Sequence, residues 1–141
     1  MKRLLVLAAV LALGPLAAPG TASAGGGCHG DYVPDAKGSQ VTFSQLCMNP
    51  MVTRIPVKGT VTWTNEDELP HNLVGAAYLW GTDGDIRPDE SVTFRFSSDG
   101  TFPYACTIHA GMLGAVVVGS GIRAADANRH DSPVSLVSVA S

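Results

Sequence analysis

The chain has 141 residues, of which 45% are hydrophobic and 15% are charged, and its formal net charge at pH 7 is −3. This length suits one domain with a substantial core and is short for two. Sixteen glycines and nine prolines favour many short strands joined by turns over a helical bundle. An acidic chain is also a poor candidate for binding nucleic acid, so we expect no nucleic-acid partner.

Residues 1–24 have the pattern of a secretory signal peptide. Lys2 and Arg3 precede an uninterrupted apolar run, and Ala22-Ser23-Ala24 supplies the small residues of a cleavage site. The apolar run is too short for a permanent membrane anchor, which needs about 20 residues. We therefore expect an exported protein, periplasmic, extracellular or associated with the cell surface, without a transmembrane span in the mature chain. Cleavage near Gly25 leaves seven basic and 12 acidic residues, a net charge of about −5.

The three cysteines need separate explanations in an exported chain, because thiols tend to pair outside the cytoplasm and an odd count leaves one over. If Cys106 belongs to a metal, Cys28 and Cys47 are the natural disulfide, closing a loop of about 20 residues worth roughly 3 kcal/mol. A second possibility is that Cys28 accepts a lipid after cleavage. Gly25, however, stands where bacterial lipoproteins usually have leucine. Residues 25–38 are interpreted as an N-terminal extension.

The strand pattern begins at Ser39. Residues 41–46 alternate with an imperfect period of two, which is typical of a half-buried edge strand. Residues 47–51 interrupt it, and their two methionines beside a cysteine, near His29, leave open a second site for a soft metal. Met48 as a filler of an irregular gap in the core is the simpler interpretation.

Six further segments are assigned in order. Residues 52–56 and 60–65 are predicted strands, and in the second Trp63 shares the core face. Residues 75–88 allow only a short strand and a loop. Residues 91–97 alternate clearly, and Asp99-Gly100 before residues 101–106 is typical of a two-residue hairpin. Residues 113–118 form a last, apolar strand.

The stretch 104–112 contains a thiol, an imidazole and a thioether, spaced Cys-x-x-His-x-x-Met as Cys106, His109 and Met112. Soft sulfur donors beside a borderline imidazole suit copper far better than calcium or magnesium. His71 is the upstream candidate for a second nitrogen donor, and Pro70 restricts the loop that presents it. Two histidines, one cysteine and a weak axial methionine describe a blue-copper electron-transfer centre.

These motifs resemble the blue copper proteins (cupredoxins), within them the plastocyanin, amicyanin and pseudoazurin group. Segments 59–72 and 100–118 carry the resemblance, which covers roughly residues 38 to 119. It implies an all-β Greek-key β-sandwich of about seven or eight strands over residues 39–119, with one type 1 copper ion at one end. The ligands implied are His71, Cys106, His109 and Met112.

The resemblance also implies roles for residues around the ligands. Asn72 would tie the two ligand segments together by hydrogen bonds and tune the thiolate. The imidazole edge of His109 would reach the surface through an apolar patch formed by Pro70, Ala110, Gly111 and Met112. The acidic run 66–68 lies just before His71 and either steers a basic partner or is simply a solvated loop.

The ligand set and the resemblance together predict a one-electron carrier that cycles between Cu(II) and Cu(I). We expect a monomer that docks transiently with a redox protein. The alternative is a copper-binding module for sequestration or delivery, which uses the same ligands without a redox partner. An enzyme is not expected, because copper oxidases and nitrite reductases need additional copper centres, and only four histidines are present.

Residues 120–141 lie outside the resemblance. They are rich in glycine, alanine, serine and charged residues, and the apolar stretch 134–140 is too short for a membrane span. We expect this tail to be disordered.

Overall fold

The computed structural model describes residues 27–28, 30–122 and 132–141. The predicted signal peptide and His29 therefore lie outside the described residues. Within them the chain forms ten strands and one turn of 3-10 helix: β1 (Asp35–Lys37), β2 (Gln40–Ser44), β3 (Cys47–Asn49), β4 (Val52–Ile55), β5 (Thr60–Asn65), β6 (Val74–Gly75), η1 (Ala76–Tyr78), β7 (Ser91–Phe96), β8 (Gly100–Ala105), β9 (Leu113–Val118) and β10 (Val134–Ala140).

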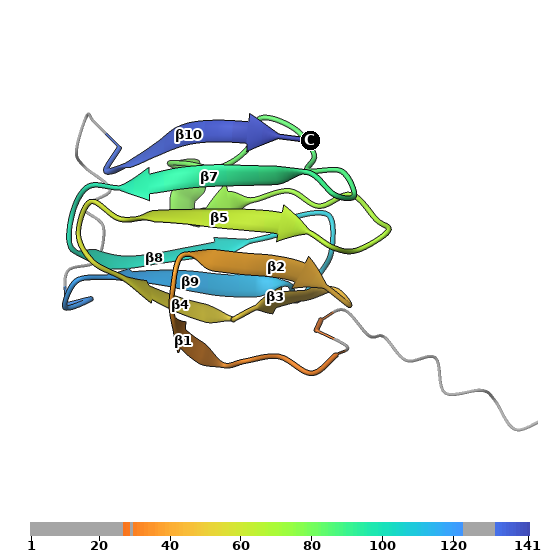
Figure 1. The fold of residues 1–141 in the computed structure, drawn as a ribbon, viewed down its shortest axis with the longest axis horizontal. Coiled ribbons are helices and arrows are strands. Elements are labelled where there is room, and N and C mark those ends of the chain that lie inside the picture. Colours follow the sequence, from red (N-terminus) through yellow and green to blue (C-terminus); the bar gives the residue numbers. More distant parts are fainter. Residues whose placement is uncertain (1–26, 29, 123–131) are drawn as a thin grey trace, which may run out of the picture.

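The strands form two sheets of five that pack face to face (Figure 1). One sheet has the order β1-β4-β9-β8-β6 and the other has the order β10-β7-β5-β2-β3. The predicted all-β sandwich is confirmed, with more strands than the seven or eight expected. The additional strands include β1, β3 and β6, which have only two or three residues and are too short to show a period of two. No helix in the described part of the chain is both long and apolar enough to cross a membrane.

Alternating side chains of the central strands build the core between the sheets. Buried residues alternate with partly buried or exposed residues along β5 and β8, so that Trp63 and Tyr104 point inward. Their rings meet edge to face with centroids 5.3 Å apart, and Phe94 of β7 approaches Trp63 in the same way at 6.0 Å. Such edge-to-face contacts add to the free energy gained from apolar burial. The inward-facing side of the 60–65 strand was predicted correctly.

Two predictions of strand connectivity were wrong. Residues 99–100 do not form a two-residue hairpin, because β7 pairs with β5 and β10 in one sheet while β8 pairs with β9 and β6 in the other. The connection crosses between the layers, which lets Phe96 and Phe102 meet in the core from opposite sheets, with centroids 5.1 Å apart. The 41–46 strand is also not an edge, since β2 lies between β5 and β3 and ends at Ser44.

The C-terminal segment differs from the disordered tail expected for residues 120–141. Val134 to Ala140 form β10, which pairs antiparallel with β7 and has an irregular register between Leu136 and Ser138. Val134 is 5% exposed and belongs to the core. The sequence of this segment does not alternate regularly between apolar and polar residues, and pairing with β7 supplies the order that its own pattern does not indicate. Residues 123–131 lie outside the described part.

The N-terminal extension also contributes to the sandwich, because β1 precedes residue 39 and pairs in parallel with β4. The structure contains the expected disulfide between Cys28 and Cys47, so neither residue is available for lipid attachment or for a second soft-metal site. Met48 is 2% exposed within the core cluster, as the simpler interpretation of that residue required.

Candidate metal centre

His71 lies at one end of the sandwich and is held by its backbone. Its N–H donates to the carbonyl of Ile86 at 3.0 Å, and the Ile86 N–H donates back to the His71 carbonyl at 2.6 Å. The imidazole is fully buried and packs against the Phe43 ring of β2, with centroids 5.1 Å apart. The position of this histidine is therefore defined by the protein itself.

The loop that leads to His71 is organised by Asn65, a fully buried polar residue at the end of β5. Its side-chain nitrogen donates to the carbonyls of Leu69 and Ile86, at 2.8 and 2.9 Å. Its side-chain oxygen accepts the Asp67 N–H at 2.9 Å. A buried amide is costly unless its hydrogen-bonding groups are satisfied. Here its partners are two groups of the loop and the carbonyl of Ile86, which also bonds to His71.

Asp67 contacts the other side of the His71 ring. Its carboxylate accepts the backbone N–H groups of Gln45 and Leu46, at 2.5 and 3.1 Å. The same group lies 3.0 Å from Nε2 of His71. Only Nδ1 of the ring is thus left for another partner. Sequence reasoning treated Asp67 as part of an exposed acidic run, although its spacing of four residues from His71 was an available signal.

The second ligand segment is the loop between β8 and β9. Cys106 follows β8 directly, and its N–H donates to the carbonyl of Met112 at 3.0 Å. The Met112 N–H in turn lies 3.4 Å from the carbonyl of His109. Gly111 has a φ of 84°, a left-handed conformation that glycine adopts without steric cost. These bonds fold the loop back on itself, and Cys106 and Met112 are 4% and 1% exposed while His109 is partly exposed.

Three potential donor atoms from the two segments converge on one point. Sγ of Cys106 lies 3.7 Å from Nδ1 of His71 and 3.6 Å from Nδ1 of His109, and the two nitrogens are 3.0 Å apart. A point equidistant from three atoms at these separations lies about 2.0 Å from each. Bonds of a transition metal to imidazole nitrogen are about 2.0–2.1 Å long and bonds to thiolate about 2.3 Å. The triangle therefore fits a single ion of this size.

Asn72 connects the two segments outside this triangle. Its side-chain nitrogen donates to Oγ1 of Thr107 at 2.7 Å, and its side-chain oxygen accepts the Thr107 N–H at 2.7 Å. Thr107 is the residue after Cys106, so the pair links neighbours of two of the three converging residues. Rotation of either loop away from the other would break both bonds.

The environment of His71 favours the neutral form of its imidazole. Burial lowers the pKa of His71, and the nearby His109 acts in the same direction, whereas the hydrogen bond that the Asp67 carboxylate accepts opposes the shift. A neutral imidazole is the form that binds a metal. The thiol of Cys106 lies beside two imidazoles and is buried, so a bound cation would also compensate the charge of its thiolate.

Comparisons with known proteins identify relatives of the chain. No family model matches the sequence. The chain is 32% identical to amicyanin-alpha of Methylorubrum extorquens over 87 residues, which is 59% of this chain and 73% of the relative. It is 34% identical to plastocyanin of Scenedesmus fuscus over 85 residues, which is 52% of this chain and 87% of the relative. The chain belongs to the blue copper (cupredoxin) family.

Solved cupredoxin structures superpose on the same part of the chain. A reduced Cu(I) form of an amicyanin variant has a TM-score of 0.54 and 26% identity, covering 57% of this chain and 80% of that one. The copper-containing nitrite reductase of Thermus scotoductus has a TM-score of 0.52 and 26% identity, but the match covers only 22% of that enzyme. The likeness to the enzyme is therefore restricted to a part of it.

The surface around the three donor residues differs from expectation both in its apolar patch and in its acidic run. Met112 is buried and does not contribute to the surface, whereas Leu69, Ile108 and Leu113 are 50%, 48% and 59% exposed. Of the acidic run, Glu66 and Glu68 are exposed, while the Asp67 side chain is only 15% exposed and is used internally. The run thus presents two solvated carboxylates.

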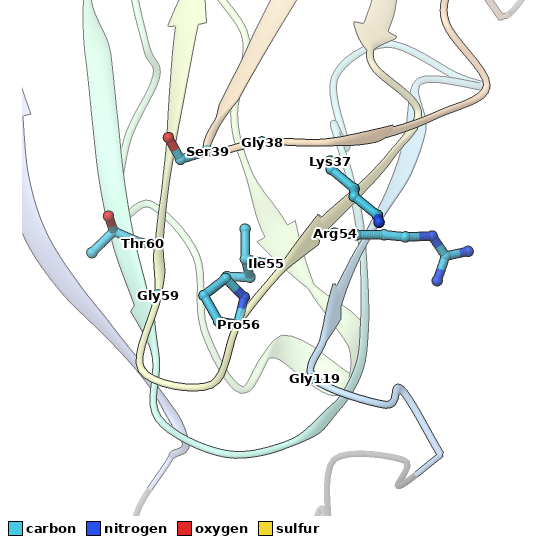
Figure 2. A pocket seen from close by; sticks show the side chains of 9 residues that line it. All are labelled: Lys37, Gly38, Ser39, Arg54, Ile55, Pro56, Gly59, Thr60 and Gly119. Carbon is cyan, nitrogen blue, oxygen red and sulfur yellow. The ribbon is translucent and has the colours of Figure 1, made fainter.

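A separate hollow of about 760 Å³ lies at the opposite end of the sandwich. Figure 2 shows Ile55 and Pro56 within it and the side chains of Lys37 and Arg54 along one side. Ile55 pairs with Val118 at the end of β9 remote from the ligand loop. The hollow contains none of the converging donor atoms and is independent of the candidate metal centre.

Proposed function

We propose that this cupredoxin binds one type 1 copper ion through His71, Cys106, His109 and Met112 and acts as an exported one-electron carrier. The observation that carries the proposal is the triangle of one sulfur and two Nδ1 atoms, with sides of 3.0, 3.6 and 3.7 Å. Met112 is a buried thioether in the same loop and would be the weak axial ligand. A copper ion bound there would supply one-electron redox chemistry.

The residues around the ligands support rapid electron transfer because they restrict the movement of the donor atoms. His71 is bound through its backbone to Ile86 and through its ring to Asp67. The Asn72–Thr107 pair joins the two ligand segments. Donor atoms that move little between oxidation states keep the reorganisation energy low. Burial of Cys106 excludes water from the thiolate.

His109 provides the route to a partner. It is the partly exposed member of the cluster, and the neighbouring Ile108 and Leu113 are exposed apolar residues. We propose that they form, with Leu69, Pro70 and Ala110, a docking patch for a redox protein. Exposed apolar residues at the rim of a site favour a protein contact, and a contact of modest size allows fast release. The Cys28–Cys47 disulfide supports export, because such bonds persist outside the reducing cytoplasm.

The proposal is tested by the absorption spectrum of the copper-loaded protein. The Cu(II) form should show an intense thiolate-to-copper band toward the red end of the visible spectrum, and reductant should bleach it. Cys106→Ser should abolish the band. The matched control Met51→Leu removes a sulfur outside the cluster and should leave the band unchanged. An intact band in Cys106→Ser would rule out the proposed ligand set.

Electrochemistry distinguishes a carrier from a copper-handling module. A carrier should give a reversible one-electron wave and rapid electron exchange between its oxidised and reduced forms. Tight retention of Cu(I) with slow exchange would instead support sequestration or delivery. The same residues serve both functions, so this measurement separates them.

A further inference from the structure

The turn between β2 and β3 has an unfavourable backbone conformation. Gln45 and Leu46 both have left-handed φ values, 55° and 58°. A two-residue hairpin turn of this kind normally uses Asn-Gly or a similar pair, because a side chain with a Cβ is disfavoured in this region. A residue with a side chain keeps a left-handed conformation only where contacts with the surrounding structure hold it there.

The first support is Asp67. Its carboxylate accepts the N–H groups of both turn residues, Gln45 and Leu46. The oxygen that accepts from Leu46, Oδ2, is also the one 3.0 Å from Nε2 of His71. Asp67 thus joins the turn to the imidazole through one carboxylate, and a shift of the turn would displace the group that orients His71.

The second support is the disulfide. Cys47 follows Leu46 directly, is fully buried and is bonded to Cys28. The N–H of Gly30 lies 3.4 Å from Sγ of Cys47. Gly30 also packs so closely against the side chain of Gln45 that an added Cβ there would overlap it. The disulfide therefore connects the N-terminal segment to the residue that directly follows the turn, and Asp67 binds the two residues of the turn itself.

Strand β2 adds a direct contact with the same histidine. Phe43 lies one residue before the end of β2, and its ring is 5.1 Å from that of His71. The carbonyl of Phe43 accepts the N–H of Glu66 at 2.9 Å, next to Asp67 in the chain. The β2–β3 hairpin and the loop that presents His71 are therefore one packed unit.

We propose that the Cys28–Cys47 disulfide and Asp67 act together as one support that positions His71 for metal binding. The inference rests on the proposed function, in which His71 ligates copper. Asp67 is a positioning residue, because it acts through the imidazole. The disulfide acts one step further away, by keeping the left-handed turn where Asp67 can bind both of its amides.

A double-mutant cycle tests this connection, with the dissociation rate of copper as the readout. Asp67→Ala should release copper about 10- to 100-fold faster, the usual effect of removing a hydrogen-bond partner of a metal-ligating histidine. The double variant Cys28→Ala/Cys47→Ala should release it about tenfold faster, at the lower end of that range. The variant with all three substitutions should release copper little faster than Asp67→Ala alone, because the disulfide is proposed to act on His71 through Asp67. Val118→Ala, a fully buried site at the far end of β9, serves as the control for general destabilisation and should leave the rate unchanged.

Measurements on the metal-free protein keep the test independent of copper binding. Loss of the disulfide should accelerate amide hydrogen exchange at Gln45 and Leu46 and change the NMR signals of the His71 ring. If the cysteine variant fails to fold, the disulfide of the folded, metal-free wild-type protein is instead reduced with a trialkyl phosphine. This reagent is oxidised to its oxide with oxygen from water while the disulfide becomes two thiols, and the same exchange is then measured.

The outcomes are distinguishable. Unchanged amide exchange and an unchanged His71 signal after loss of the disulfide would overturn the proposed support. An equal acceleration of copper release by loss of the disulfide, with or without Asp67, would show that the effect does not pass through Asp67 and would equally refute it. A wild-type protein with no blue copper spectrum would instead refute the proposed function, while the metal-free measurements would still decide whether the support exists.

Discussion

Two asparagines hold the chain segments that form the candidate metal centre. Asn65 is fully buried and bonds to two backbone groups of the loop before His71 and to the carbonyl of Ile86. Asn72 bonds twice to Thr107 across the two ligand segments. The two asparagines have the same side chain but different surroundings, and they should therefore make different contributions to stability.

Asn65→Ala is expected to lower the free energy of unfolding of the metal-free protein by about 3 kcal/mol, because it removes three hydrogen bonds and leaves a cavity at a fully buried site. Asn72→Ala should cost only about 1 kcal/mol, because its hydrogen bonds with Thr107 are exposed to water and can be replaced by it. Urea unfolding of both variants at one pH checks the comparison. Equal losses would show that burial of Asn65 is not what makes it important.

At the scale of elements, the sandwich includes two strands outside the predicted domain of residues 39–119, namely β1 and β10. β10 covers the edge of β7 and contributes Val134 to the core, whereas its remaining residues are exposed. β1 pairs with β4 and is linked to it by Arg54, whose Nη2 lies 2.6 Å from Oδ2 of Asp35. Each of these strands can be tested by a substitution on the strand itself.

Val134→Ala should reduce the free energy of unfolding by about 1–2 kcal/mol, because it removes two buried methyl groups from the core. Val137→Ala, on the same strand but 55% exposed, should change it by less than about 0.5 kcal/mol. Thermal and urea unfolding of the two variants provide the measurement. If Val134→Ala is as neutral as Val137→Ala, β10 is not part of the cooperative fold.

The contribution of the β1–β4 ion pair should depend on pH. The hydrogen bond from Arg54 is the main cause that holds the pKa of Asp35 below its ordinary value of 3.8. A carboxylate with a lowered pKa stabilises the folded state above 3.8, and this contribution is lost as the pH falls through its folded pKa. The difference in urea midpoint between wild type and Asp35→Asn should therefore be present at neutral pH and vanish under strongly acidic conditions. The exposed carboxylate variant Glu68→Gln is the control, and a difference for Asp35→Asn that persists in acid would contradict this origin.

At the scale of the whole molecule, the two ends of the sandwich have different characters. One end brings together the three donor residues, exposed apolar side chains and the exposed carboxylates of Glu66 and Glu68. The other has the hollow bordered by Lys37 and Arg54 (Figure 2). A partner approaching the donor end meets a weakly acidic rim, which favours basic proteins through long-range attraction.

The rate of electron transfer to a basic redox protein should fall as salt is raised, because salt screens this attraction. Glu66→Gln/Glu68→Gln should reduce that salt dependence while leaving the visible spectrum unchanged. Asp67 is unsuitable for this test, since its carboxylate is bonded to the β2–β3 turn and to His71. Stopped-flow kinetics over a range of ionic strength provide the measurement, and an unaltered salt slope in the double variant would show that these two carboxylates do not steer the partner.

The sequence by itself determined the class of fold and the chemistry of the candidate centre. Both are expressed locally, as alternation along 60–65 and 91–97 and as the types and spacing of donors in the 104–112 loop. Only the tertiary structure decided that β7 and β8 belong to different sheets, that β10 joins the fold, and that Asp67 supports His71 rather than facing solvent. The physical reason is that sheet pairing and burial depend on contacts between residues distant in the chain, which a local pattern of side chains does not encode.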